Sequence, residues 1–274
     1  MRAAAKTSPY PGTQAVQRAV GLLKAFTPER PALRLPELTT VAGLNKTTTY
    51  RLLSALVVEG LLERAPETGE YRLGPELLAL GSRALGATAL RAAARAELQA
   101  LAYATRETAT VEVLVGRDVL ILDEAAGDHV VASMPSLGTR WPAHATSTGK
   151  VLLAHLPDAA LDSLLELPLE AATARTVVDP AVLRRELARV RARGWALASE
   201  ELEAGFVAVG APIRSNQLQG GAAGEVVAAI SVGGPKSRLN QERVREILRS
   251  LPAVTARISA RLGAPTNQAR GARK

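Results

Sequence analysis

The chain has 274 residues, 47% of them hydrophobic and 22% charged, which is ordinary for a globular protein of about two domains. It contains no cysteine, which excludes disulfides and thiolate metal sites, and no apolar run approaches the roughly 20 residues of a membrane span. The N-terminus lacks the apolar stretch of a secretory signal, so we expect a cytoplasmic protein, and the net charge of +8 favours an anionic partner such as nucleic acid.

The first part of the chain predicts three helices followed by a hairpin. Helical spacing and strand-like runs place the helices over 14–26, 36–43 and 45–59 and the strands over 61–64 and 70–73. Thr13 and Asn45 are candidate N-caps, and Gly43 is a candidate helix stop. This order predicts a winged helix-turn-helix DNA-binding domain over 13–74, preceded by a disordered tail over 1–12.

The third helix is the candidate DNA-reading element. Thr49, Leu52, Leu53 and Leu56 share one helical face, which should turn to the core. The first turns of such a helix reach base edges in the major groove, where arginine can contact guanine and hydroxyls can reach bases or phosphates. The side chains that we expect to contact DNA, two of them from the hairpin, are Lys46, Thr47, Thr48, Tyr50, Arg51, Arg64 and Arg72. The alternative is that this face is only a solvated helix surface.

The rest of the chain predicts a second, mixed domain. Residues 75–105 are rich in Ala, Leu and Arg and predict a helical linker that also serves as a dimer contact. Strands are expected over 108–115, 119–123, 130–134, 195–199, 206–213 and 224–232, and helices over 146–156, 158–165, 180–193 and 240–262. Hairpin-like turns favour a largely antiparallel sheet with helices packed around it, over 106–263, before a basic disordered tail over 264–274.

Several runs resemble the IclR family of bacterial regulators. In the first domain they are Gln17-Arg18-Ala19-Val20-Gly21-Leu22-Leu23, Gly43-Leu44-Asn45-Lys46-Thr47-Thr48-Thr49-Tyr50-Arg51-Leu52-Leu53 and Thr68-Gly69-Glu70-Tyr71-Arg72-Leu73-Gly74. In the second they are Gly138-Thr139-Arg140-Trp141-Pro142-Ala143-His144-Ala145-Thr146-Ser147-Thr148-Gly149-Lys150, Arg193-Gly194-Trp195, Gly205, Ala211-Pro212-Ile213 and Ser231-Val232-Gly233-Gly234-Pro235. The resemblance runs in order from about residue 14 to about 262.

The resemblance implies a mixed α/β (α+β) chain, with an N-terminal winged helix-turn-helix and a C-terminal GAF-like domain that binds a small-molecule effector, usually a carboxylate. A helix that begins near Thr146 could receive an anion at its free N–H groups. The implied effector-binding residues are Trp141, Ala145, Ser147, Thr148, Phe206, Ala208, Ser231 and Gly233. For Ser147 and Thr148 the alternative is a simple helix cap, for Trp141 a place in the core, and for Ser231 a bond to the backbone.

The chain departs from some members of the family at two pocket positions. Where those members carry a carboxylate and a serine, this sequence has Ala198-Ser199 and Gly233. We therefore expect a less polar pocket that fits a larger, more apolar effector such as an aromatic acid, on which Trp141 could stack.

The sequence gives little support for an enzymatic function. His144 stands where a phosphate-binding loop before Gly149-Lys150 needs glycine, and no nucleophile elbow is present. The carboxylates Glu200, Glu201 and Glu203 lack an identifiable catalytic partner, and a latch or a solvated turn is the better interpretation. A metal-binding sensor using His144 and these acids and a purely architectural DNA protein remain alternatives. We predict no catalytic site, cofactor or metal.

The partners that we predict are double-stranded DNA and a small-molecule effector, with no membrane. One recognition helix reads too few bases for useful specificity, so we expect a homodimer or homotetramer on a pseudo-palindromic operator.

Overall fold

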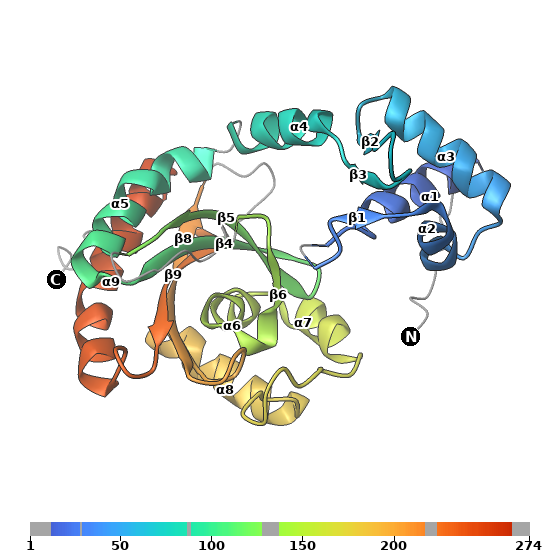
Figure 1. The fold of residues 1–274 in the computed structure, drawn as a ribbon. Helices are drawn as coiled ribbons and strands as arrows, with labels where there is room; N and C mark the ends of the chain where they lie inside the picture. Colours follow the sequence, from blue (N-terminus) through green and yellow to red (C-terminus); the bar gives the residue numbers. More distant parts are fainter. Residues whose placement is uncertain (1–11, 28, 87–88, 128–136, 217–223, 265–274) are drawn as a thin grey trace, which may run out of the picture. The chain divides into compact units, whose positions relative to one another are not determined.

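The computed structural model of the chain describes residues 12–27, 29–86, 89–127, 137–216 and 224–264. Its contacts divide the chain into two compact units, Met1–Ala87 and Thr88–Lys274, each described by itself below (Figure 1). The two predicted tails lie almost entirely outside the described residues, and so does the strand expected over 130–134. No helix within the described ranges has both the length and the hydropathy that a membrane span requires.

The first unit contains the predicted helices and hairpin. Its elements are α1 (Gln14–Leu23), β1 (Ala32–Leu33), α2 (Leu35–Ala42), α3 (Lys46–Val58), β2 (Leu62–Arg64), β3 (Tyr71–Leu73) and α4 (Pro75–Gly86). The three strands pair antiparallel in the order β1-β3-β2. One core joins the helices to this small sheet, and its buried members are Leu22, Phe26, Leu33, Leu38, Leu53, Leu56, Leu62 and Tyr71. The unit is therefore a winged helix-turn-helix, as the sequence predicts.

Capping chemistry sets the ends of the two helices of the motif. Gly43 has φ +63°, a left-handed conformation that glycine adopts without strain, and it ends α2. The Asn45 side chain then accepts the Thr48 N–H at 2.8 Å and begins α3. Thr13 holds the N-cap position of α1, as predicted, but its backbone angles are helical and its side chain makes no capping hydrogen bond.

The short strand β1 is absent from the sequence-based assignment. Ala32 and Leu33 pair with Arg72 and Tyr71 of β3. Two residues are too few to show the alternation by which a strand is recognised in a sequence, so only tertiary pairing reveals this one.

The second unit is one sheet between two layers of helices. Its elements are α5 (Ala89–Thr105), β4 (Thr108–Val115), β5 (Asp118–Ala125), β6 (Arg140–Pro142), the short 3-10 helix η1 (Ala143–Ala145), α6 (Ser147–Ala154), α7 (Asp158–Leu165), α8 (Pro180–Arg193), β7 (Ala196–Ser199), β8 (Phe206–Ser215), β9 (Glu225–Pro235) and α9 (Gln241–Arg261). The described strands form a sheet in the order β6-β5-β4-β9-β8-β7, and each neighbouring pair is antiparallel. This confirms the predicted mixed fold.

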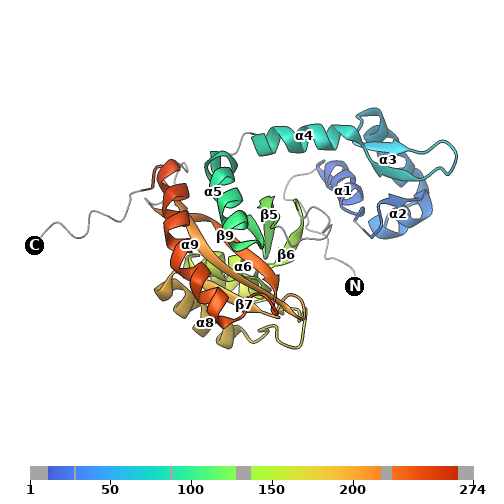
Figure 2. The same cartoon turned by 60° about the vertical axis from the view of Figure 1, so that its left-hand side comes forward.

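The two faces of the sheet have different chemistry. Figures 1 and 2 show α5 and α9 on one face and α6 and α8 on the other. Along β4, Ala109 and Val111 face the apolar layer under α5 and α9, whereas Thr110 and Glu112 face the side of α6. The period of two thus gives the α6 face its polar groups.

An irregularity between β4 and β5 changes which side chains reach that face. Opposite Glu112 the register shifts by one residue, so Leu122 is an extra residue in β5. A bulge of this kind reverses the alternation of side chains. As a result Ile121 and Glu124 both lie on the side of α6, while Asp123 pairs with arginines of α5.

Helix α6 lies unusually close to its neighbours, and all eight of its residues are buried. A Cβ on Gly149 would stand 2.1 Å from the carbonyl oxygen of Ala143, closer than any real contact. A Cβ on Gly210 of β8 would stand 3.2 Å from the carbonyl carbon of Ser147. Because Gly149 has no side chain, the backbone can make the tight turn that leads from η1 into α6.

We expect Gly149→Ala to lower the free energy of unfolding of the second unit by about 2–4 kcal/mol, because backbone atoms must move to admit the methyl group. Gly21→Ala in α1 is the matched control, since its Cβ would meet nothing within 4 Å. That change should stabilise its own unit by about 0.5–1 kcal/mol. Urea unfolding followed by circular dichroism measures both, and equal midpoints for Gly149→Ala and the unmodified protein would contradict the close approach.

Candidate functional sites

The outer face of α3 is polar from its first residue. Thr49, Leu53 and Leu56 are buried in the core, as predicted, and Leu52 is half-buried. This orientation leaves Lys46, Thr47, Tyr50 and Arg51 exposed and Thr48 half-buried. The arrangement offers a cation, two hydroxyls and a guanidinium along the helix start, and their contact with DNA stays a prediction.

The hairpin adds further cations beside this helix in the same unit. Arg64 and Arg72 are exposed on neighbouring strands, and the Arg64 guanidinium lies 5.7 Å from the centre of the Tyr71 ring. Glu70 lies within 3.9 Å of Arg72 and within 3.4 Å of Arg34. Arg34 was not selected from the sequence, because only the pairing of β1 with β3 brings it to the hairpin.

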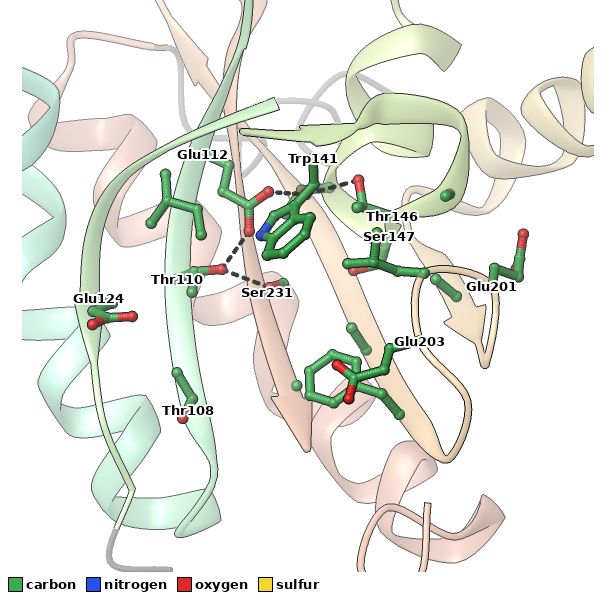
Figure 3. A pocket seen from close by; sticks show the side chains of 18 residues that line it. Thr108, Thr110, Glu112, Glu124, Trp141, Thr146, Ser147, Glu201, Glu203 and Ser231 are labelled. Carbon is green, nitrogen blue, oxygen red and sulfur yellow. Dashed lines mark hydrogen bonds between the residues drawn. The ribbon is translucent and has the colours of Figure 1, made fainter. Parts of the chain in front are cut away.

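The second unit holds a cavity of about 310 Å³ between the polar face of the sheet and the start of α6. Its volume is at the lower end of the range for sites of small ligands. The structure brings all eight predicted effector-binding residues to its walls, namely Trp141, Ala145, Ser147, Thr148, Phe206, Ala208, Ser231 and Gly233. Figure 3 shows Trp141 between Glu112 and Thr110 of β4 and Ser147 of α6.

The start of α6 forms one wall of the cavity. Its N-cap is Thr146, whose hydroxyl oxygen accepts the Gly149 N–H at 3.0 Å. The interpretation of Ser147 and Thr148 as simple caps is therefore wrong, since they occupy the first two helical positions. Both side chains are buried at the end of the helix where N–H groups and the helix dipole favour negative charge.

Aromatic side chains supply an apolar part of the cavity. Trp141 on β6 is 39% exposed, so it lines the cavity rather than filling the core. A Cβ on Gly233 would lie 2.7 Å from the tip of the Phe206 ring. Glycine at this position therefore makes room for the ring, which is a structural reason for it besides a ligand contact.

Four carboxylates also line the cavity, and sequence reasoning missed their common location. They are Glu112, Glu124, Glu201 and Glu203. No lysine, arginine or histidine is among the described residues that line it. These carboxylates add charge to a cavity whose lining is otherwise largely apolar, and the expectation of a pocket less polar than in some members of the family stays a prediction. The sequence of β4 could have revealed the polar lining of the cavity. In this strand Thr108, Thr110 and Glu112 alternate with apolar residues, so all three lie on one face of the sheet.

Glu112 is held by hydroxyl groups instead of a cation. Its Oε1 accepts from the Thr110 hydroxyl at 2.6 Å, and its Oε2 accepts from the Thr148 hydroxyl at 2.5 Å. The hydroxyls of Thr110 and Ser231 are 2.8 Å apart, so Ser231 extends the same network (Figure 3). Burial raises the pKa of Glu112, and the two threonine hydroxyls partly offset that rise.

A buried lysine fixes the loop that follows β7. Lys150 of α6 is fully buried, and its Nζ lies 2.6 Å from both carboxylate oxygens of Glu201 and 2.8 Å from Glu186 of α8. Burial raises the pKa of Glu201, and the Lys150 ammonium opposes that rise. This ion pair joins α6, α8 and the cavity wall, so Glu201 is not part of a solvated turn, and a conformational latch at this acidic segment stays a prediction.

His144 makes a structural contact beside the start of α6. It is buried, its Nε2 lies 2.9 Å from the carbonyl oxygen of Glu170, and burial lowers its pKa. Within the described ranges, no three His, Asp or Glu side chains are grouped as ligands of a metal ion.

Two protein-family models together match nearly all of the part of the chain that the structure describes. Residues 15–66 match the IclR helix-turn-helix domain, and residues 82–260 match the family described as bacterial transcriptional regulator IclR C-terminal. The two matches fall on the winged helix-turn-helix and on the unit with the cavity.

Individual relatives are similar over the same length. The chain is 31% identical to the HTH-type transcriptional regulator XynR of Escherichia coli (strain K12), over 93% of this chain and 99% of that protein. It is 32% identical to the transcriptional repressor IclR of the same strain, over 89% and 88%. Both relatives are transcriptional regulators.

Solved structures agree with the fold. An IclR homolog from Microbacterium hydrocarbonoxydans, complexed with 4-hydroxybenzoate, is 30% identical and superimposes with a TM-score of 0.77. The match covers 92% of this chain and 100% of that one.

The titration of Glu112 gives a prediction for stability. Because its folded pKa is raised, the folded state holds the proton more tightly than the unfolded state. The contribution of Glu112 to stability is then largest at low pH and is lost as the pH rises through its folded pKa. We expect Glu112→Gln to exceed the unmodified protein in free energy of unfolding by on the order of 1 kcal/mol near pH 9, with no difference below about pH 4.

Urea unfolding over that pH range measures this difference. Glu203→Gln is the matched control, since it changes an exposed carboxylate of the same cavity. A constant difference between Glu112→Gln and the unmodified protein at every pH would contradict the raised pKa.

Proposed function

The chain belongs to the IclR family of bacterial transcriptional regulators, and on that premise we propose that a small-molecule effector in the cavity controls its affinity for operator DNA. The chain has the helix-turn-helix DNA-binding domain and the C-terminal ligand-binding domain of that family. The observation that carries the proposal is that the eight side chains implied by the family resemblance all line one cavity. With DNA as its partner, the regulator acts in the cytoplasm.

The DNA contacts that we propose are those of α3 and the hairpin. Arg51 and the hydroxyls of Thr47 and Thr48 read base edges or neighbouring phosphates, and Lys46 contacts a phosphate. Arg64 and Arg72 hold the backbone or the minor groove. The exposure of these side chains and the positive charge of the N-terminal part of the chain support this assignment.

The effector that we propose is a small carboxylic acid with an aromatic body. The N–H groups at the start of α6 and the hydroxyl of Ser147 favour its carboxyl group, while Trp141 and Phe206 suit a ring. The relative from Microbacterium hydrocarbonoxydans was solved with such an acid, 4-hydroxybenzoate. That ligand supports the proposed class of effector.

We further propose that the regulator is a homodimer or homotetramer on a pseudo-palindromic operator. The exposed side chains of Leu78 and Leu80 make α4 a candidate contact between copies. The segment 75–105 comprises α4 and α5, and α5 buries Leu98 and Leu101 against the sheet of the second unit. Effector binding would act through this segment on the spacing of the recognition helices, by binding one arrangement more tightly than the other.

Substitutions on α3 separate base reading from phosphate binding. We expect Arg51→Ala to weaken binding to a duplex from upstream of the gene by about 5- to 150-fold, with little effect on a scrambled duplex, because a guanine contact contributes about 1–3 kcal/mol. Lys46→Ala should weaken both and lower the salt slope by about one. Fluorescence anisotropy across a salt series measures these effects.

Arg249→Ala is the charge-matched control, since it removes an exposed cation from α9 and should change neither affinity. Equal, steeply salt-dependent binding of the unmodified protein to both duplexes would contradict a specific regulator of that site.

A further inference from the structure

The cavity combines an anion-favouring helix start with a carboxylate at the same point. Thr148 is the second residue of α6, and its hydroxyl donates directly to Glu112. The N–H groups that would hold an effector carboxylate are therefore within one helical turn of the group that holds Glu112. An acid anchored at this helix start would therefore have its carboxyl group beside the carboxyl of Glu112.

Among the described residues that line the cavity, no cation is present to balance the negative charges of an effector carboxylate and of Glu112. The other titratable groups that line it are acids, Glu124 on β5 and Glu201 and Glu203 after β7. Lys150 of α6 is committed to Glu201 and Glu186, and His144 of η1 is bonded to a carbonyl oxygen. The residues of β9 that line the cavity, Ser231 and Gly233, carry no charge.

Two carboxyl groups in contact without a cation do not both ionise, and they share one proton. The hydroxyl network suits this state, because Thr110 can donate to Glu112 or turn toward Ser231 as the proton moves. The free protein is already prepared for it, since burial raises the pKa of Glu112.

We propose that the effector carboxyl group binds against the Glu112 carboxyl with one proton shared between them, so that the cavity prefers weak carboxylic acids to anions of strong acids, whose oxygens are poorer proton acceptors. In the complex an O–H···O⁻ bond joins the two groups, and its proton comes from Glu112 or, when Glu112 is ionised, from solvent. This inference rests on the proposed effector site, and it assigns Glu112 as the residue that sets its selectivity.

Calorimetry without DNA tests the inference with benzoate, 4-hydroxybenzoate and phenylacetate as probes and benzenesulfonate as the matched strong acid. We expect carboxylate affinity to fall by up to about tenfold per pH unit above the pKa of Glu112, within a scan from about pH 5 to 9. Near pH 6, benzenesulfonate should bind the unmodified protein at least about tenfold more weakly than benzoate. Above the same pKa, binding in two buffers of different ionisation enthalpy should show uptake of about one proton per carboxylate.

The variant Glu112→Gln places a permanent N–H donor where the proton would be. We expect its affinity for carboxylates to change by less than about twofold over the scan and its preference over the sulfonate to shrink to a few fold. Glu203→Gln, the control within the same cavity, should keep the pH dependence of the unmodified protein.

Three results would overturn the inference. These are equal pH dependence in the unmodified protein and Glu112→Gln, equal binding of sulfonate and carboxylate by the unmodified protein, and no binding of any of the three carboxylates near pH 6. Because DNA is absent from these measurements, they stand apart from the proposed regulation. Proton-linked binding that leaves DNA affinity unchanged would support the inference and contradict effector control.

Discussion

The close seating of α6 on the sheet is the constraint on which the polar interior of the second unit depends. Glycine at 149 allows the backbone of α6 to touch that of Ala143, and glycine at 210 allows β8 to approach Ser147. From this position Thr148 reaches Glu112 on the sheet and Lys150 reaches Glu201 on the loop after β7. One helix start thus places an anion-favouring surface, a buried carboxyl and an ion pair around a single cavity.

Much of the fold could be predicted because local signals agree with tertiary packing. The bounds of α7 and α8 match the sequence prediction residue for residue, since apolar spacing and flanking prolines mark them. Asn45 caps α3 as expected, and the eight residues selected by resemblance meet at the cavity. A family resemblance that extends along the whole chain identified pocket residues that lie far apart in the sequence, which no single motif could do.

The remainder depends on pairings that the sequence does not encode locally. In the sequence, Glu112 is indistinguishable from an ordinary strand residue. Its side chain is buried beside α6 because β4 pairs with β5 on one side and β9 on the other. The bulge at Leu122 decides that Glu124 and not Asp123 faces the cavity, and it has no sequence signature. The short strands β1 and β6 escaped prediction for the same reason, because two or three residues show no periodicity.

The cavity and the DNA-reading helix are, on this account, two coupled sites of one regulator, and coupling between binding sites is reciprocal. The most direct measurement titrates the duplex and the tightest-binding aryl carboxylate in both orders at fixed pH and salt. We expect the factor by which the carboxylate changes the Kd of the duplex to equal the factor by which the duplex changes the Kd of the carboxylate, at about 5- to 150-fold. A carboxylate that fills the cavity yet leaves the Kd of the duplex unchanged would contradict effector control of DNA binding.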